Sequence, residues 1–75
     1  MTQQKGNSSR IGILANGVAT TVAAGSLADV VAELGHGAVK VATALNGEFV
    51  PERARASTSV KAGDRIEVLS ARQGG

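Results

Sequence analysis

The stretch SLADVVAELG, residues 26–35, decides the fold of this 75-residue chain. The Ser26 hydroxyl can cap a free N–H of the first turn, Asp29 stands three residues on as in an acidic capping box, and Gly35 is suited to a left-handed end. The apolar side chains recur at i, i+3, i+4 and i+7, the spacing of one helical stripe: Leu27, Val30, Val31 and Leu34. The pattern predicts one amphipathic helix with this stripe against a sheet.

The segments on both sides of this helix are typical of strands. Asn16-Gly17 and Asn46-Gly47 are pairs that two-residue hairpin turns prefer, because a type I′ turn needs positive φ at both positions. The expected strands are residues 11–15, 18–23, 39–45, 48–50 and 65–70. Residues 52–60 show no period and are expected as a loop with at most one helical turn. This order favours an α+β roll in which one helix crosses a mixed sheet.

Length and composition indicate a single small domain. At 75 residues, folding buries only about 60% of the surface that the unfolded chain exposes, so the core is thin. We expect residues 1–10 to be a disordered leader, 11–70 the domain, and 71–75 a flexible tail. Residues 1–10 lack the apolar stretch of a signal peptide, and no apolar run is long enough to span a bilayer. These features favour a cytoplasmic protein.

Reactive side chains are scarce, which argues against an enzyme. The absence of Cys excludes disulfides, thiol nucleophiles and thiolate zinc sites, and one His cannot make a metal cluster. We interpret His36, between two glycines, as a solvated or helix-end residue. Glu48 and Glu52 are the acidic residues nearest to a general acid/base pair, but solvated faces explain them better. A single Phe and scattered basic residues disfavour nucleic-acid binding. No catalytic residue and no metal site is therefore predicted.

The chain ends in Gly74-Gly75, directly after a predicted strand and a short polar tail. Composition alone would place two glycines there in about 2% of such chains, which favours a function, with a frayed end or a cloning scar as the alternative. A terminal carboxylate that must enter another protein's active site is best carried on residues without a Cβ. Glycines pass a narrow channel and adopt the backbone angles that it imposes.

Several segments together resemble one family of ubiquitin-like proteins. They are LNGE at 45–48 followed by Val50-Pro51, STSVKAGDRIEV at 57–68, the helix at 26–35 and the terminal Gly-Gly. In this order and spacing, over residues 11–75, they are similar to the thiamine-biosynthesis sulfur carrier family, ThiS. The chain departs from the family in its longer leader and in RARA at 53–56, which lacks an aromatic residue. The resemblance implies a ubiquitin-like β-grasp fold, with one helix on a mixed sheet of about five strands.

The resemblance also implies a function as a protein co-substrate. An adenylating enzyme (ThiF-like) would convert the Gly75 carboxylate to an acyl-adenylate, sulfur from a donor would replace AMP, and the thiocarboxylate would serve thiazole synthase (ThiG-like). No cofactor would be bound by the chain itself, because ATP and sulfur arrive through these partners. Gln73 and Gly74 would be the threading tail. Leu69 and Arg72, on the exposed sheet face beside the tail, are expected to contact the partners.

Two alternatives stay open from the sequence. The small subunit of molybdopterin synthase shares the fold, the tail and the activation chemistry, but tends to carry a Phe-Pro-Pro-like stretch where this chain has LSARQ at 69–73. A plain β-grasp binding module with an incidental Gly-Gly is the other alternative. Scattered charge and scarce aromatics argue against an RNA-binding module of this kind.

Overall fold

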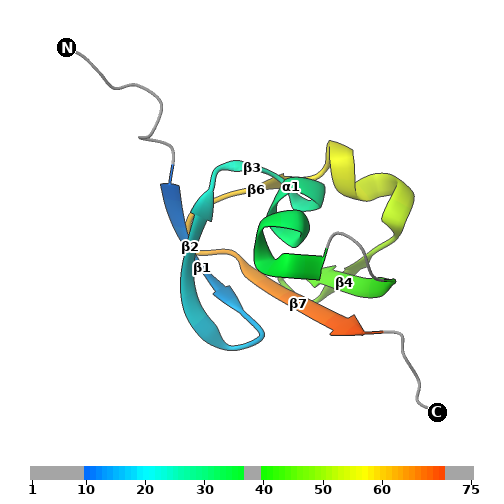
Figure 1. Ribbon diagram of the computed structural model, residues 1–75, viewed down its shortest axis with the longest axis horizontal. Helices are drawn as coiled ribbons and strands as arrows, with labels where there is room; N and C mark the ends of the chain where they lie inside the picture. The colour runs from blue at the N-terminus through cyan, green and yellow to red at the C-terminus, as the bar shows by residue number, and fades with distance from the viewer. Residues whose placement is uncertain (1–9, 37–39, 71–75) are drawn as a thin grey trace.

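Five strands form one mixed sheet in the order β2-β1-β7-β4-β5 (Figure 1). The computed structural model describes residues 10–36 and 40–70. The strands are β1 (Arg10–Ala15), β2 (Val18–Ala23), β4 (Val41–Leu45), β5 (Glu48–Val50) and β7 (Arg65–Ser70). Hairpins join β1 to β2 and β4 to β5, while the last strand, β7, lies parallel to β1 and antiparallel to β4. The last strand in the sequence, β7, therefore lies in the middle of the sheet.

The helix begins where the sequence predicts and changes geometry midway. In α1 (Leu27–Val31), the Ser26 hydroxyl accepts from the Asp29 N–H at 3.1 Å and the Asp29 carboxylate accepts from the Ser26 N–H at 3.2 Å. The chain continues in a wider, π-type segment, η1 (Ala32–His36). Gly35 has a φ of 95°, a left-handed conformation that glycine adopts without the clash of a Cβ. The predicted capping box and left-handed glycine are both present.

Two short strands were not predicted from the sequence. β3 (Gly25–Ser26) pairs with β6 (Ser59–Val60) in a separate two-stranded sheet. Between β5 and β6 lies a 3₁₀ helix, η2 (Glu52–Ser57), where the sequence suggests a loop with at most one helical turn. The strand expected over 39–45 begins at Val41, and Val39 lies outside the described residues. Among the described residues, no helix is long and apolar enough to cross a membrane.

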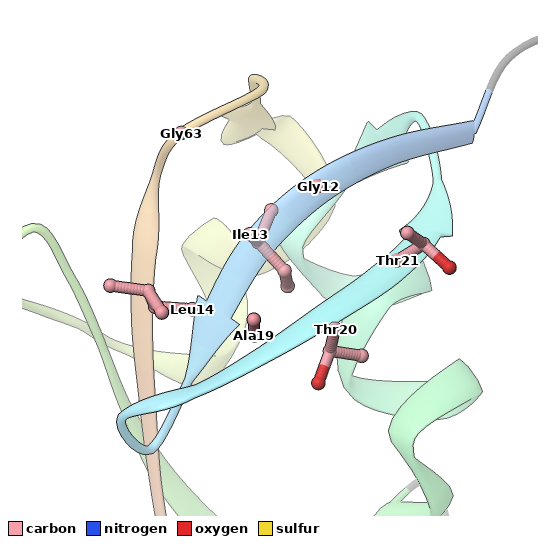
Figure 2. A pocket seen from close by; sticks show the side chains of 7 residues that line it. All are labelled: Gly12, Ile13, Leu14, Ala19, Thr20, Thr21 and Gly63. Carbon is pink, nitrogen blue, oxygen red and sulfur yellow. The ribbon is translucent and has the colours of Figure 1, made fainter.

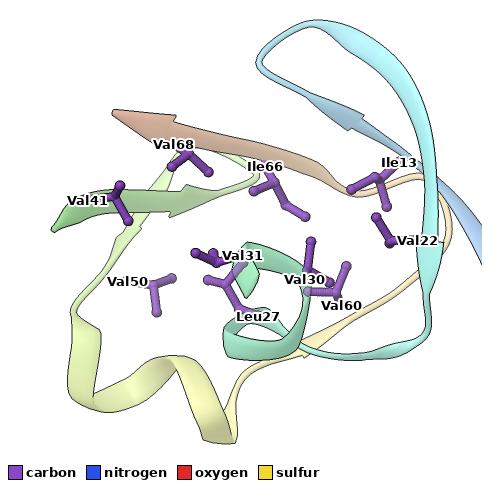
Figure 3. Close-up of a cluster of buried hydrophobic side chains, with 10 residues drawn as sticks. All are labelled: Ile13, Val22, Leu27, Val30, Val31, Val41, Val50, Val60, Ile66 and Val68. Carbon is purple, nitrogen blue, oxygen red and sulfur yellow. The ribbon is translucent and has the colours of Figure 1, made fainter. Parts of the chain in front are cut away.

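The core lies between α1 and one face of the sheet (Figure 3). The helix contributes Leu27, Val30 and Val31, all buried, and Leu34 packs against the same cluster while half-buried. The other buried apolar residues come from the strands: Ile13, Val22, Val41, Val50, Val60, Ile66 and Val68. The stripe read from the sequence is confirmed. The opposite face of the sheet has no helix over it within the described residues (Figure 1).

Candidate functional site

The structure describes one of the five predicted site residues. Leu69 lies in β7, one residue before the strand ends, and its residue surface is 68% exposed. Arg72, Gln73, Gly74 and Gly75 lie outside the described residues, and their assigned roles stay predictions. The described part of the site is therefore the base of the tail and the sheet face around it.

The base of the tail is held by the centre of the sheet. β7 pairs with β4 from Ile66 to Ser70, and with β1 on its other side at Arg65 and Ile66. The side chain of Asn16, in the β1–β2 turn, adds a bridge to this strand: its Nδ2 donates to the Val68 carbonyl at 3.1 Å, and its Oδ1 accepts from the Val68 N–H at 2.8 Å. These bonds fix the strand two residues before its end.

A second turn asparagine holds the other end of β7. Asn46, in the β4–β5 turn, accepts from the Arg65 N–H at 2.8 Å through Oδ1 and donates through Nδ2 to Asp64 Oδ1 at 3.1 Å. The second Asp64 oxygen accepts from the Lys61 N–H at 2.7 Å. The pKa of Asp64 is held below its usual value, chiefly by the hydrogen bond from the Lys61 N–H and, to a smaller extent, by the bond from Asn46. The two Asn-Gly turns thus brace the strand that leads to the tail.

The outer sheet face beside the tail carries the exposed apolar residues Leu69 and Phe49. Cross-strand pairing places Leu69 opposite Ala42 and Phe49 opposite Ala44, so these four side chains share one face. Phe49 is 69% exposed, and with Glu67 these residues line a shallow hollow of about 110 Å³. We call Ala42, Ala44, Phe49, Glu67 and Leu69 the outer patch.

A second depression lies over β1 and β2, but it offers no chemistry. Figure 2 shows the residues that line it, among them Gly12, Leu14, Ala19 and Gly63. None of the residues that line it is ionisable, so it holds no acid, base or cation. It lacks the convergent polar groups that a small-molecule site uses for orientation.

A third hollow lies beside the helix, and one of the residues that line it, Arg55, has a structural role. Its lining includes His36, Glu52 and Arg55. The half-buried Arg55 donates from Nε to Thr43 Oγ1 at 3.0 Å and from Nη2 to the Val41 carbonyl at 2.6 Å, tying η2 to β4. Among residues 10–36 and 40–70, no group of His, Cys, Asp or Glu could hold a metal ion.

A helix on one face of a mixed five-stranded sheet, with the last strand at its centre, defines a ubiquitin-like β-grasp protein. The family model ThiS family matches residues 10–75, and the chain belongs to that family. A solved structure, thiamine biosynthesis protein (ThiS) from Geobacter metallireducens, is 30% identical with a TM-score of 0.73. The match covers 87% of this chain and 100% of that one. The comparison with curated proteins returned no match.

The family assignment supports the coarse function expected from the sequence, a small sulfur carrier of thiamine biosynthesis that is not itself a catalyst. The sequence analysis did not include Phe49, which the structure places on the same face as Leu69. The sequence does contain a signal for Phe49. Val50 is an apolar residue at the end of a strand that Pro51 stops; if Val50 faces the core, the alternation of side chains along a strand turns its neighbour Phe49 to the opposite face. Only the pairing of β5 with β4 and of β4 with β7 brings Phe49 and Leu69 to one patch.

Proposed function

We propose that this chain carries sulfur as a C-terminal thiocarboxylate on Gly75, for the synthesis of the thiazole ring of thiamine. Membership of the ThiS family, together with a chain that ends in Gly-Gly, is the observation that carries the proposal. The chemistry needs no reactive side chain from the carrier, which agrees with a sequence without Cys. We also propose that the carrier works in the cytoplasm and binds no cofactor of its own.

The chemistry proceeds by activating a poor electrophile. A Gly75 carboxylate oxygen attacks the α-phosphorus of ATP in a ThiF-like adenylating enzyme, and pyrophosphate leaves. Hydrosulfide supplied by the donor then attacks the acyl carbon, and AMP leaves with the oxygen that joined it to Gly75. The resulting thiocarboxylate gives its sulfur to a ThiG-like thiazole synthase. The carrier contributes the carboxylate, a tail narrow enough to bring that carboxylate into the partner's active site, and a surface that the partners recognise.

The partners would recognise the folded domain as well as the tail. A tail of five residues offers too little area for a specific interface, since such interfaces bury about 800 Å² on each partner. The outer patch supports a second contact, because it presents Leu69 and Phe49 next to the strand from which the tail departs. Arg72, three residues after Leu69, would add a charged contact to this surface.

Adenylation is the step that tests this proposal at the carrier. The full chain is incubated with ATP, labelled pyrophosphate and the adenylating enzyme, and return of label into ATP measures reversible acyl-adenylate formation. We expect exchange that depends on the carrier and is abolished by deletion of Gly75. A Gly74→Val variant should also fail, because its Cβ blocks close passage and narrows the accessible backbone angles. Exchange at the wild-type rate with the Gly75 deletion would contradict the proposal.

A further inference from the structure

The outermost strand β2 leaves one row of main-chain groups unpaired by the sheet (Figure 1). Its register with β1 places Leu14 opposite Ala19 and Gly12 opposite Thr21. Leu14 donates its N–H to the Asp64 carbonyl at 3.0 Å, and the Gly12 carbonyl accepts from the Gly63 N–H at 2.8 Å. The N–H and C=O groups of these β1 residues therefore point toward β7 and not toward β2. In an antiparallel pair, the N–H and C=O groups of the β2 residues opposite them then point away from β1. The open edge therefore presents the main chains of Ala19, Thr21 and Ala23.

An ion pair from two other elements covers part of this edge. Arg10 of β1 donates from Nη1 to Glu33 Oε2 of η1 at 2.9 Å, and from Nη2 to the Thr21 carbonyl at 3.0 Å. The other Glu33 oxygen, Oε1, accepts from the Ala23 N–H at 2.9 Å. That backbone bond is the main cause that holds the pKa of Glu33 below its usual value. We call this pair, with its two main-chain bonds, the Arg10–Glu33 clip.

The strand itself lacks the features with which proteins usually protect a sheet edge. Edges are commonly protected by charged side chains, proline, bulges or very short strands. β2 reads VATTVA, six residues without a charge or a proline, and its pairing with β1 runs without a bulge. The opposite edge, β5, is three residues long, begins at Glu48 and is followed by Pro51. Protection of β2 thus depends on the clip, whereas β5 protects itself.

We propose that the β2 edge is a strand-pairing surface for a second copy of this chain, held closed by the Arg10–Glu33 clip. Two copies related by a two-fold axis at Thr21 would place Ala19 of each copy opposite Ala23 of the other. Each of these pairs would then exchange two main-chain hydrogen bonds. VATTVA carries no charge of its own, so once the clip is open the two paired β2 strands bring no like charges together, and the two sheets join into one. This inference is independent of the carrier function and concerns the assembly of the folded domain.

The test removes the clip and measures the mass of the full chain in solution by sedimentation velocity over a wide concentration range. The wild-type chain should stay at its monomer mass of 7.5 kDa. The Arg10→Ala/Glu33→Ala variant should shift toward twice that mass as concentration rises. A matched control, Glu52→Ala/Arg53→Ala, removes the same charges from exposed positions of η2 and should stay monomeric. A clip variant that is folded and stays monomeric at all concentrations would overturn the proposal.

Two further variants test where the copies meet. Thr21→Lys in the clip-free chain places a charge on the edge and should restore the monomer. Thr21→Cys in the clip-free chain should form a disulfide between copies, because a hydrogen-bonded antiparallel pair has Cα atoms about 5.5 Å apart, within disulfide reach. Glu48→Cys, on the β5 edge, should not cross-link. Dimers that persist with Thr21→Lys, or that cross-link through residue 48 and not 21, would overturn the assignment to β2.

Circular dichroism establishes that each variant is folded before its mass is interpreted. If the double variant does not fold, Arg10→Ala alone serves, because it opens the ion pair and the Thr21 bond while leaving the Glu33–Ala23 bond in place. We expect this single variant to dimerise at higher concentration than the double variant. A folded Arg10→Ala chain that stays monomeric over the whole range would contradict the proposal.

Discussion

Asn16 combines a left-handed backbone with two side-chain hydrogen bonds to the central strand. Its φ of 51° suits the β1–β2 turn, and its side-chain amide pairs with both main-chain groups of Val68. An amide side chain presents a donor and an acceptor in the arrangement of a peptide group. The turn residue therefore extends the ladder between β1 and β7 toward the tail. The sequence predicts the turn, but not this bridge to a residue 52 positions away.

We predict that Asn16→Gly destabilises the fold without disturbing the turn. Glycine keeps the positive φ, while both bonds to Val68 are lost, which at about 0.5–1.5 kcal/mol each costs about 1–3 kcal/mol in the free energy of unfolding. Asn46→Gly is the matched variant, since Asn46 has a φ of 52° but makes its bonds at an exposed site. Urea denaturation measures both. An Asn16 variant less affected than the Asn46 variant would contradict this account.

The lowered pKa of Asp64 implies that the fold loses stability at acid pH. Its pKa in the fold is lowered from 3.8, chiefly by the Lys61 N–H, so the unfolded chain binds its proton at higher pH than the folded chain. The stabilisation is fully present above pH 3.8 and is lost as the pH falls through the lower pKa of the fold. In the Asp64→Asn variant, the free energy of unfolding should therefore fall less steeply below pH 3.8. Urea denaturation at several pH values measures this slope. An unchanged slope would show that Asp64 is not the group responsible.

At the scale of elements, the helix stripe predicts graded costs of truncation. Leu27 is 0% exposed at the start of α1, whereas Leu34 is half-buried beyond the change to π-type geometry. Leu27→Ala should cost about 2–5 kcal/mol, the range for buried leucines, and Leu34→Ala clearly less. Thermal and urea unfolding measure both variants. Equal costs would mean that the two leucines bury the same area in solution, contrary to the packing described.

Elements with a long pattern could be predicted from the sequence, and elements defined by contacts could not. The helix face and the five main strands follow from periods of 3.6 and 2 with strong turn signals. β3 and β6 are two residues each, too short for any period, and exist because they pair with each other. The π-type segment Ala32–His36 likewise has no signal of its own in the residues, because AELG continues the helical pattern.

At the scale of the whole molecule, the sheet order places the tail on the most firmly held strand. β7 is last in sequence and third in the five-strand order. Its first residues pair with both β1 and β4, and its last residues, Val68 to Ser70, pair with β4 beside the outer patch. From the sequence alone, the Gly-Gly ending and Leu69 are selected as candidate site residues. The place of Phe49 in the outer patch could not be predicted, because it requires two strand pairings that bring residues 49 and 69 together. Local pattern thus predicts the reactive end, and topology defines the surface around it.

The outer patch should affect partner binding and not folding. Phe49→Ala and Leu69→Ala should each weaken binding to the adenylating enzyme by about tenfold, which corresponds to about 1.4 kcal/mol. Val18→Ala is the matched control, an apolar residue 64% exposed at the β1–β2 hairpin, away from the patch. Titration calorimetry measures the affinities. A Val18 variant as weak as the patch variants would remove the patch from the interface.

The central claim is that Gly75 carries the sulfur, and the intact mass of the chain tests it most directly. The chain is incubated with ATP, its adenylating enzyme and a sulfur donor, then weighed whole and after proteolysis. The account predicts a gain equal to the exchange of one oxygen for one sulfur, located on the C-terminal peptide and absent from the Gly75 deletion. A deletion variant that still gains sulfur, or a full chain that never does with its own partner enzyme, would contradict the claim and favour a plain binding module.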